Sequence, residues 1–142
     1  MAIAKRFLLL SILLLVFCTS YGQNYIGMHK GEIIKKVGEE LPGFKFSKEV
    51  YNNSKSFIKF ENTFEEQTLI FMLNTDGYCT AVSRMYNTWL FNRLKDELNS
   101  KYGKSNKLKW IEDREGIRYE IELIKGKWFL TVVTRKYKDQ KD

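Results

Sequence analysis

The sequence predicts an α+β domain in which two helices pack on one face of an antiparallel sheet, in the order one helix, four strands, one helix, three strands. Two segments carry apolar residues at helical spacing, and seven others show strand-like runs or alternation. The links between successive strands are of hairpin length, which makes neighbouring strands antiparallel. Because two helices are too few to cover both faces of such a sheet, we expect the other face to be polar, partly open or a binding surface.

The two helices are predicted at residues 30–41 and 88–102. Pro42 and Gly43 end the first helix, and Gly103 ends the second. The apolar faces consist of Ile33, Ile34, Val37 and Leu41 in the first helix and Leu90, Phe91, Leu94, Leu98 and Tyr102 in the second.

Strands are predicted at residues 44–51, 56–61, 67–73, 78–86, 107–112, 117–125 and 128–135. The segment 67–73 is nearly all apolar, which is typical of a central strand, and Asp76-Gly77 in the link that follows is a hairpin signal. Strict alternation in 78–86 assigns Cys79, Ala81, Ser83 and Met85 to the core side, and Tyr78, Thr80, Val82, Arg84 and Tyr86 to the opposite side.

Residues 1–22 have the pattern of a signal peptide. Lys5 and Arg6 precede an apolar run at 7–17 that is too short to span a bilayer, and Ser20 and Gly22 are small residues three and one before a cut ahead of Gln23. We therefore expect export, with a periplasmic or secreted single domain at 23–142 whose tail, 136–142, frays. Lipidation of Cys18 is the alternative that would tether the chain to a membrane.

Cleavage leaves Cys79 as the only cysteine of the mature chain, so no internal disulfide is possible. Its place in a strand-like run predicts a buried, inert thiol. A disulfide-linked dimer is the alternative, and it requires an exposed thiol.

The mature chain is basic, with 22 Lys and Arg against 17 Asp and Glu once Lys5 and Arg6 are removed. The densest basic stretch consists of Lys101, Lys104, Lys107 and Lys109. A solvated loop after a helix is the favoured interpretation, and an anionic surface, such as lipid headgroups or a cell-wall polymer, is the alternative partner. The sequence has no nucleic-acid-binding motif.

Catalytic and metal-binding patterns are absent from the sequence. His29 is the single histidine and lies where the first helix starts, so we expect it to have a role at the helix start. One histidine and one cysteine make a zinc site implausible, and phosphate-binding, dinucleotide and nucleophile-elbow motifs are missing. A carboxylate pair from distant segments leaves little local signature and stays open. We therefore expect a non-enzymatic protein with no cofactor.

Aromatic residues offer a different route to function. Trp89, Trp110 and Trp128 lie in three different elements, and core packing is the favoured role, with exposure of one or two on the open face as the alternative. The side chains expected to bind a partner on that face are Tyr78, Tyr86, Trp128 and Phe129.

The segment from Tyr25 to Ile33 (Tyr-Ile-Gly-Met-His-Lys-Gly-Glu-Ile) resembles the entry of small exported domains of the outer-membrane assembly lipoprotein BamE and β-lactamase inhibitor protein type. Those domains open with a Gly-Met-(Thr/Ser)-x-x-(Glu)-Val element that starts a helix packed on an antiparallel sheet. Here His29 replaces the hydroxyl cap, and a second helix directly after the first is not evident. The block from Leu98 to Gly103, followed by Trp110 and two strands, is similar to a theme of small exported bacterial proteins. The resemblance implies a helix-on-sheet interaction module of the cell envelope and carries over no catalytic or binding residue.

These observations together predict a non-enzymatic exported envelope protein. It would act as an inhibitor-like or assembly-like protein-interaction module through its exposed sheet face, with an envelope or secreted protein as partner. The alternative is a binder of a small ligand or an anionic envelope polymer through Lys101, Lys104, Lys107 and Lys109. The oligomeric state stays open.

Overall fold

The computed structural model describes residues 21–139, and these form a seven-stranded antiparallel sheet with two α-helices. The α+β class and the order of helices and strands are confirmed. The helical elements are η1 (Gln23–Tyr25), α2 (Lys30–Glu40), η2 (Thr88–Leu90) and α3 (Phe91–Tyr102). The strands are β1 (Lys45–Val50), β2 (Ser56–Asn62), β3 (Gln67–Leu73), β4 (Cys79–Asn87), β5 (Lys109–Arg114), β6 (Ile117–Lys125) and β7 (Phe129–Lys136). Most of the predicted signal peptide, Cys18 included, lies outside the described residues.

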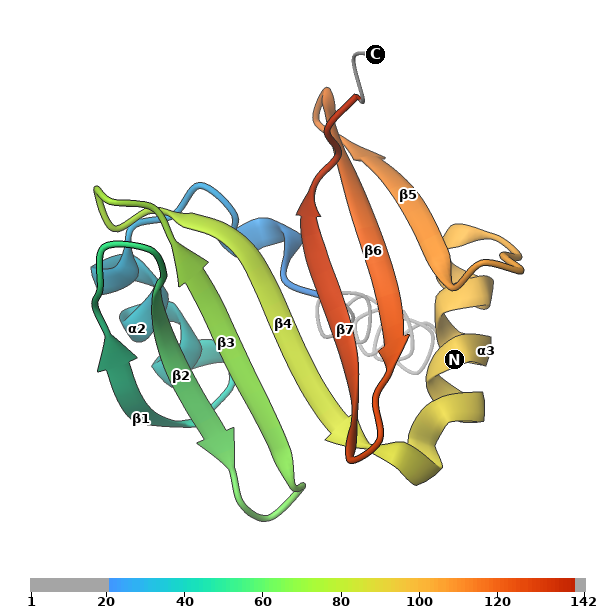
Figure 1. The fold of residues 1–142 in the computed structure, drawn as a ribbon, viewed down its shortest axis with the longest axis horizontal. Coiled ribbons are helices and arrows are strands. Elements are labelled where there is room, and N and C mark those ends of the chain that lie inside the picture. The colour runs from blue at the N-terminus through green and yellow to red at the C-terminus, as the bar shows by residue number, and fades with distance from the viewer. Residues whose placement is uncertain (1–20, 140–142) are drawn as a thin grey trace, which may run out of the picture.

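The strands follow the spatial order β1-β2-β3-β4-β7-β6-β5, so the last strand of the chain lies inside the sheet. Two antiparallel meanders, β1 to β4 and β5 to β7, are joined by the pairing of β4 with β7 (Figure 1). That pairing runs from Ala81 opposite Arg135 to Asn87 opposite Phe129.

Both hydrophobic clusters of the protein lie on one face of this sheet. The register places six buried side chains in a row from strand to strand: Ile58, Phe71, Val82, Thr134, Ile121 and Trp110. Helix α2 adds Ile33 and Val37 to the cluster over β2 to β4, and α3 adds Leu94 and Leu98 to the cluster over β5 to β7. Because members of both clusters share this row, the two helices cover the same face.

A bulge in β4 changes which of its side chains are buried. Leu73 pairs with Cys79 and Met72 pairs with Ala81, which leaves Thr80 as an extra residue. From this point the alternation is shifted by one position, so Val82 and Tyr86 lie on the buried face. The predicted faces of 78–86 are therefore wrong beyond Cys79: Ala81, Ser83 and Met85 lie on the open face instead of in the core.

The first helix begins where the sequence predicts it, and the second begins later. His29 caps α2, because its Nδ1 accepts a hydrogen bond from the Gly31 amide at 3.3 Å, which agrees with the role expected at the helix start. The predicted second helix, 88–102, opens with the 3₁₀ turn η2, and its α-helical part starts at Phe91.

The N-terminal segment is part of the core. Gln23 is buried, and its Nε2 donates hydrogen bonds to the Tyr102 hydroxyl at 2.8 Å and to Glu112 Oε2 at 2.6 Å. Gly22 has a φ of 103°, and a Cβ at this position would lie 2.7 Å from the Val82 side chain. Only glycine fits there without displacing the sheet.

The C-terminal end of the domain is also ordered further than expected. Lys136 belongs to β7, and the Tyr137 amide donates to the Arg118 carbonyl at 2.8 Å. The predicted fraying from residue 136 is wrong for these two residues, and residues 140–142 lie outside the described part of the chain.

Loss of Tyr21 and Gly22, which cleavage ahead of Gln23 would cause, is expected to destabilise the domain. The fully buried Thr134 hydroxyl donates to the Tyr21 carbonyl at 2.7 Å, and without that acceptor it is left unpaired. We expect a chain starting at Gln23 to have a free energy of unfolding about 1–3 kcal/mol below that of a chain starting at Tyr21. Urea denaturation of the two chains measures the difference, and equal midpoints would contradict it.

Candidate functional site

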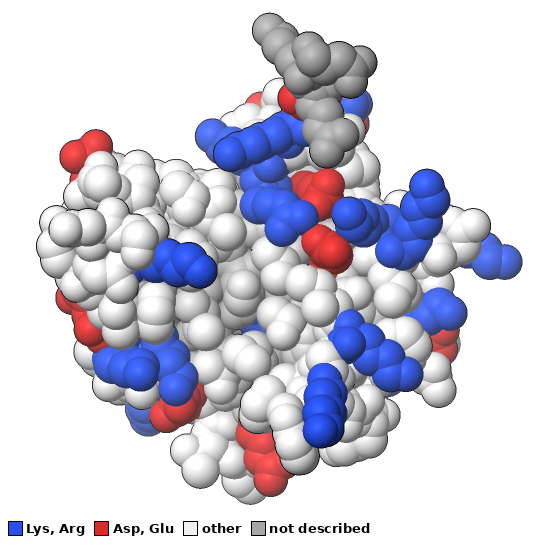
Figure 2. Space-filling view, viewed as in Figure 1, with Lys and Arg blue, Asp and Glu red and all other residues white. Residues whose placement is uncertain are grey.

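The face of the sheet opposite the helices carries a central strip of partly exposed apolar side chains. The register places them on neighbouring strands: Met72 lies between Phe57 and Ala81, and Ser83 lies between Ile70 and Val133. The strip consists of Phe57, Ile70, Met72, Ala81, Met85 and Val133, with Ser83 and Thr131 among them. Figure 2 shows this face, with a largely uncharged surface over β2 to β4.

Charged side chains border the central strip, and many of them are paired. Toward β6 and β5, Arg135 Nη2 contacts Glu120 Oε1 at 2.6 Å and Glu122 Oε2 at 2.9 Å. Toward β1, Lys59 Nζ lies 2.7 Å from Glu61 Oε1, and this hydrogen bond lowers the pKa of the Glu61 carboxyl. An apolar centre with a charged rim is the usual anatomy of a protein–protein interface.

The four aromatic residues predicted to bind a partner lie in different environments. Tyr86 is only 7% exposed and packs in the cluster with Leu94 and Leu130, so the prediction that it lies on the surface is wrong. Its burial raises the pKa of the phenol. Tyr78 is exposed beside His29 at the β3–β4 turn, outside the central strip. Phe129 is exposed and pairs with Asn87, next to the strip, and Trp128 is exposed in the β6–β7 turn.

The three tryptophans divide into one core residue and two surface residues. Trp110 is buried, and its Nε1 donates to Asn99 Oδ1 at 3.1 Å. Trp89 and Trp128 are largely exposed, so the expectation that tryptophan serves core packing is wrong for both. Trp128 is the first residue of its predicted strand and follows Gly126 by two positions, whereas Trp110 lies inside its predicted strand, and this difference is the sequence signal that separates them.

The four lysines of the basic stretch are exposed but do not gather on one surface. Lys109 lies in β5 on the open face, opposite Glu122. Lys101 lies in the last turn of α3 on the other side of the sheet, with its Nζ 5.3 Å from the ring centre of Tyr21. Desolvation in this position lowers the pKa of Lys101. Lys104 and Lys107 lie in the connection between these two elements.

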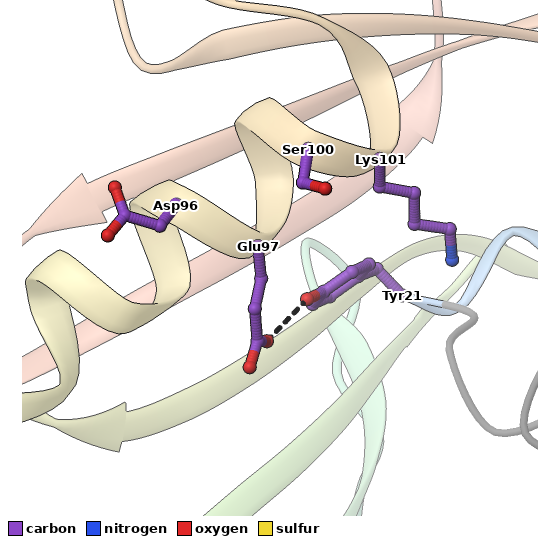
Figure 3. A pocket seen from close by; sticks show the side chains of 5 residues that line it. All are labelled: Tyr21, Asp96, Glu97, Ser100 and Lys101. Carbon is purple, nitrogen blue, oxygen red and sulfur yellow. Dashed lines mark hydrogen bonds between the residues drawn. The ribbon is translucent and has the colours of Figure 1, made fainter.

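A groove of about 630 Å³ lies between α3 and the N-terminal segment at Tyr21. It is lined by Tyr21, Asp96, Glu97, Ser100 and Lys101 (Figure 3). The Tyr21 hydroxyl donates to Glu97 Oε2 at 3.2 Å and closes one side of the groove. Its lining has both carboxylates and a lysine, so it does not form the cationic patch that an anionic polymer would require.

The Cys79 thiol is held inside the core. Cys79 is buried, its Sγ donates to the Ala81 carbonyl at 3.4 Å, and desolvation raises the pKa of the thiol to about 12. The prediction of a buried thiol is therefore confirmed.

Within residues 21–139 no group of three or more His, Cys, Asp or Glu side chains could hold a metal ion. None of the helices described is long and apolar enough to cross a membrane.

The Cys79 thiol of a chain starting at Tyr21 is expected to resist a thiol-specific disulfide reagent while the protein is folded. A protonated thiol inside the core is neither nucleophilic nor accessible, so labelling should follow unfolding and become fast in urea. Absorbance of the released thiolate measures the rate under both conditions. Rapid labelling of the folded protein would contradict burial and would reopen the disulfide-linked dimer.

Comparison with known proteins gives no match to any family model, curated protein or solved structure. The resemblance of residues 25–33 to the BamE and β-lactamase inhibitor protein type stays a prediction.

Proposed function

We propose that this chain is a non-enzymatic, exported envelope protein that binds another protein through the open face of its sheet. The observation that carries the proposal is the central strip. Six apolar side chains from four adjacent strands lie together on the face that neither of the described α-helices covers. Patches of contiguous apolar surface on a folded domain commonly mark interaction sites.

The geometry of the face supports a protein partner better than a small ligand. A sheet supplies a broad, rigid surface, and the paired charges at its rim, such as Arg135 with Glu120 and Glu122, fix the orientation of a partner. A small ligand would need a concave pocket that surrounds most of its surface. The central strip instead offers side-chain ends in a row across the strands.

The non-enzymatic part of the proposal is supported by the contacts of Cys79 and His29. Burial holds the thiol protonated, and the imidazole Nδ1 is occupied as the cap of α2. Export is supported by the pattern of residues 1–22, and tethering through Cys18 remains the alternative. The second prediction, an anionic ligand or polymer at Lys101 to Lys109, has weaker support because Lys101 and Lys109 lie on opposite sides of the sheet.

The test is capture of a partner from the native envelope fraction by a tagged chain that starts at Tyr21. The variant Met72→Glu/Val133→Glu places two charges in the central strip, and we expect it to lose a protein that the wild type captures in stoichiometric amount. The matched control, Tyr51→Glu/Phe64→Glu, adds the same charge at two exposed sites outside the strip and should keep the partner.

Thermal unfolding of all three proteins accompanies the capture, so that a folding defect is not mistaken for loss of binding. Capture retained by the Met72→Glu/Val133→Glu variant, or lost equally in the control, would contradict the proposed binding face.

A further inference from the structure

One end of the sheet carries exposed aromatic side chains from two connections that lie next to each other. The turn from β6 to β7 and the 3₁₀ turn η2 after β4 are both at this end (Figure 1). The exposed fractions are 77% for Trp89, 73% for Trp128 and 50% for Phe129. The pairing of Asn87 with Phe129 brings the two connections side by side.

Lysines accompany these aromatic rings. Lys127 Nζ lies 5.2 Å from the ring centre of Trp128, and Lys125 Nζ lies 4.6 Å from that of Phe91. Trp89, Lys125, Lys127, Trp128 and Phe129 together are called the basic aromatic corner below. The corner is separate from the central strip, although one of its members, Phe129, borders the strip.

The two segments that build the corner are cationic. Residues 87–95 and 124–131 contain two Lys or Arg each and no Asp or Glu. Of the carboxylates on neighbouring elements, Glu66 accepts a hydrogen bond from Asn87 at 2.6 Å and Glu97 accepts one from Arg93 at 3.2 Å, while Asp96 directly follows the first segment. The corner therefore presents Lys125 and Lys127 to an approaching surface, and neither of the two segments that form it contains a carboxylate.

We propose that the basic aromatic corner docks on the surface of a bilayer that contains anionic lipid. Indole rings are amphipathic and favour the headgroup region, where the ring contacts acyl chains and the N–H stays hydrated. Lysines beside them are attracted to lipid phosphates. Aromatic and cationic side chains on projecting turns fit this occupant, because shallow insertion of turn tips requires no concave site.

This inference does not depend on the proposed protein partner. The corner lies at the end of the strands, whereas the central strip lies on the face of the sheet. Docking through the corner would leave the strip accessible, so one protein could contact a membrane and a partner at the same time.

The test uses a chain starting at Tyr21, since residues 21–139 contain every described helix and strand and both hydrophobic clusters. Co-sedimentation measures binding to vesicles of phosphatidylcholine and phosphatidylglycerol (about 7:3) and to vesicles of phosphatidylcholine alone. We expect binding to the anionic vesicles, weakening with salt, with a blue shift of the tryptophan emission. Trp110 is buried and contributes a constant background.

Two variants and a control identify the corner. Lys125→Gln/Lys127→Gln should weaken binding about twenty-fivefold, from about fivefold for each lysine near an anionic surface. Trp89→Ala/Trp128→Ala should weaken it about tenfold or more and remove the emission shift. The control Tyr51→Ala/Tyr78→Ala, which removes two exposed rings in the β1–β2 and β3–β4 connections at the opposite end of the sheet, should bind as the wild type does.

Several results would overturn the proposal. These are failure of the folded wild type to bind anionic vesicles, equal binding to vesicles without anionic lipid, or unchanged binding by the two corner variants. Loss of a captured protein in the Trp89→Ala/Trp128→Ala variant, with no vesicle binding by the wild type, would assign the corner to a protein partner instead.

Discussion

Replacement of Phe71 by alanine is expected to lower the free energy of unfolding by about 3–5 kcal/mol. Phe71 is fully buried in β3, and its ring centre lies 5.1 Å from that of Tyr25 and 5.7 Å from that of Phe60. It therefore joins the N-terminal segment to the sheet, and truncation leaves a cavity that neither neighbour can fill. Urea denaturation followed by circular dichroism measures the change.

The matched control is Phe64→Ala. Phe64 lies in the β2–β3 turn and is 97% exposed, so its loss should change the free energy of unfolding by no more than about 0.5 kcal/mol. A similar loss of stability in both variants would show that the cluster around Phe71 is not packed as described.

The second large effect is expected for Trp110→Ala, which should also cost about 3–5 kcal/mol of unfolding free energy. The indole packs among α3 and β5 to β7, and its N–H donates to Asn99 Oδ1. Trp110→Phe keeps most of the apolar contacts and loses the hydrogen bond, so it should be less destabilising, by about 1–3 kcal/mol relative to the wild type. Thermal and urea unfolding of both variants measure the two contributions.

The other two tryptophans are the controls for Trp110. Trp89→Ala and Trp128→Ala remove exposed side chains, and each should alter the free energy of unfolding by no more than about 0.5 kcal/mol. If either variant were as unstable as Trp110→Ala, the description of Trp89 and Trp128 as exposed side chains would be contradicted.

Much of the fold could be predicted because local patterns determine it. The strands Gln67–Leu73 and Ile117–Lys125 have the bounds that were expected from the apolar run and from the alternation. The α+β class and the element order follow from the same patterns together with the short links. These features depend on residues close together in the chain, so the sequence carries their signal.

The side chains of the open face could not all be predicted because a single residue in β4 decides which of them lie there. The bulge at Thr80 shifts the alternation of β4 by one position, and no glycine or proline marks it. The shift moves Met85 to the open face and Tyr86 into the core. One unrecognised extra residue thus hid part of the central strip and placed a core tyrosine among the expected partner-binding residues.

The second reason why the structure differs from the prediction is that some positions depend on contacts between residues far apart in the sequence. The insertion of β7 between β4 and β6 depends on the whole sheet, and hairpin-length links say nothing about it. Likewise, Lys101 and Lys109 are close in sequence but lie on opposite sides of the sheet, because the chain leaves α3 at Gly103 before it enters β5.

The position of β7 determines the order in which this chain can complete its fold. Until Phe129–Lys136 leaves the ribosome, β4 has no neighbour on one side, the β5–β6 hairpin has no link to the first meander, and the Tyr21 carbonyl lacks Thr134. The contact between Thr134 and the Tyr21 carbonyl joins residues 113 positions apart, so Tyr21 gains this hydrogen bond only after β7 has joined the sheet. A chain shortened before β7 would expose two additional open strand edges, on β4 and β6, which are templates for aggregation. The topology thus delays closure of the sheet until β7 is available to pair with both β4 and β6.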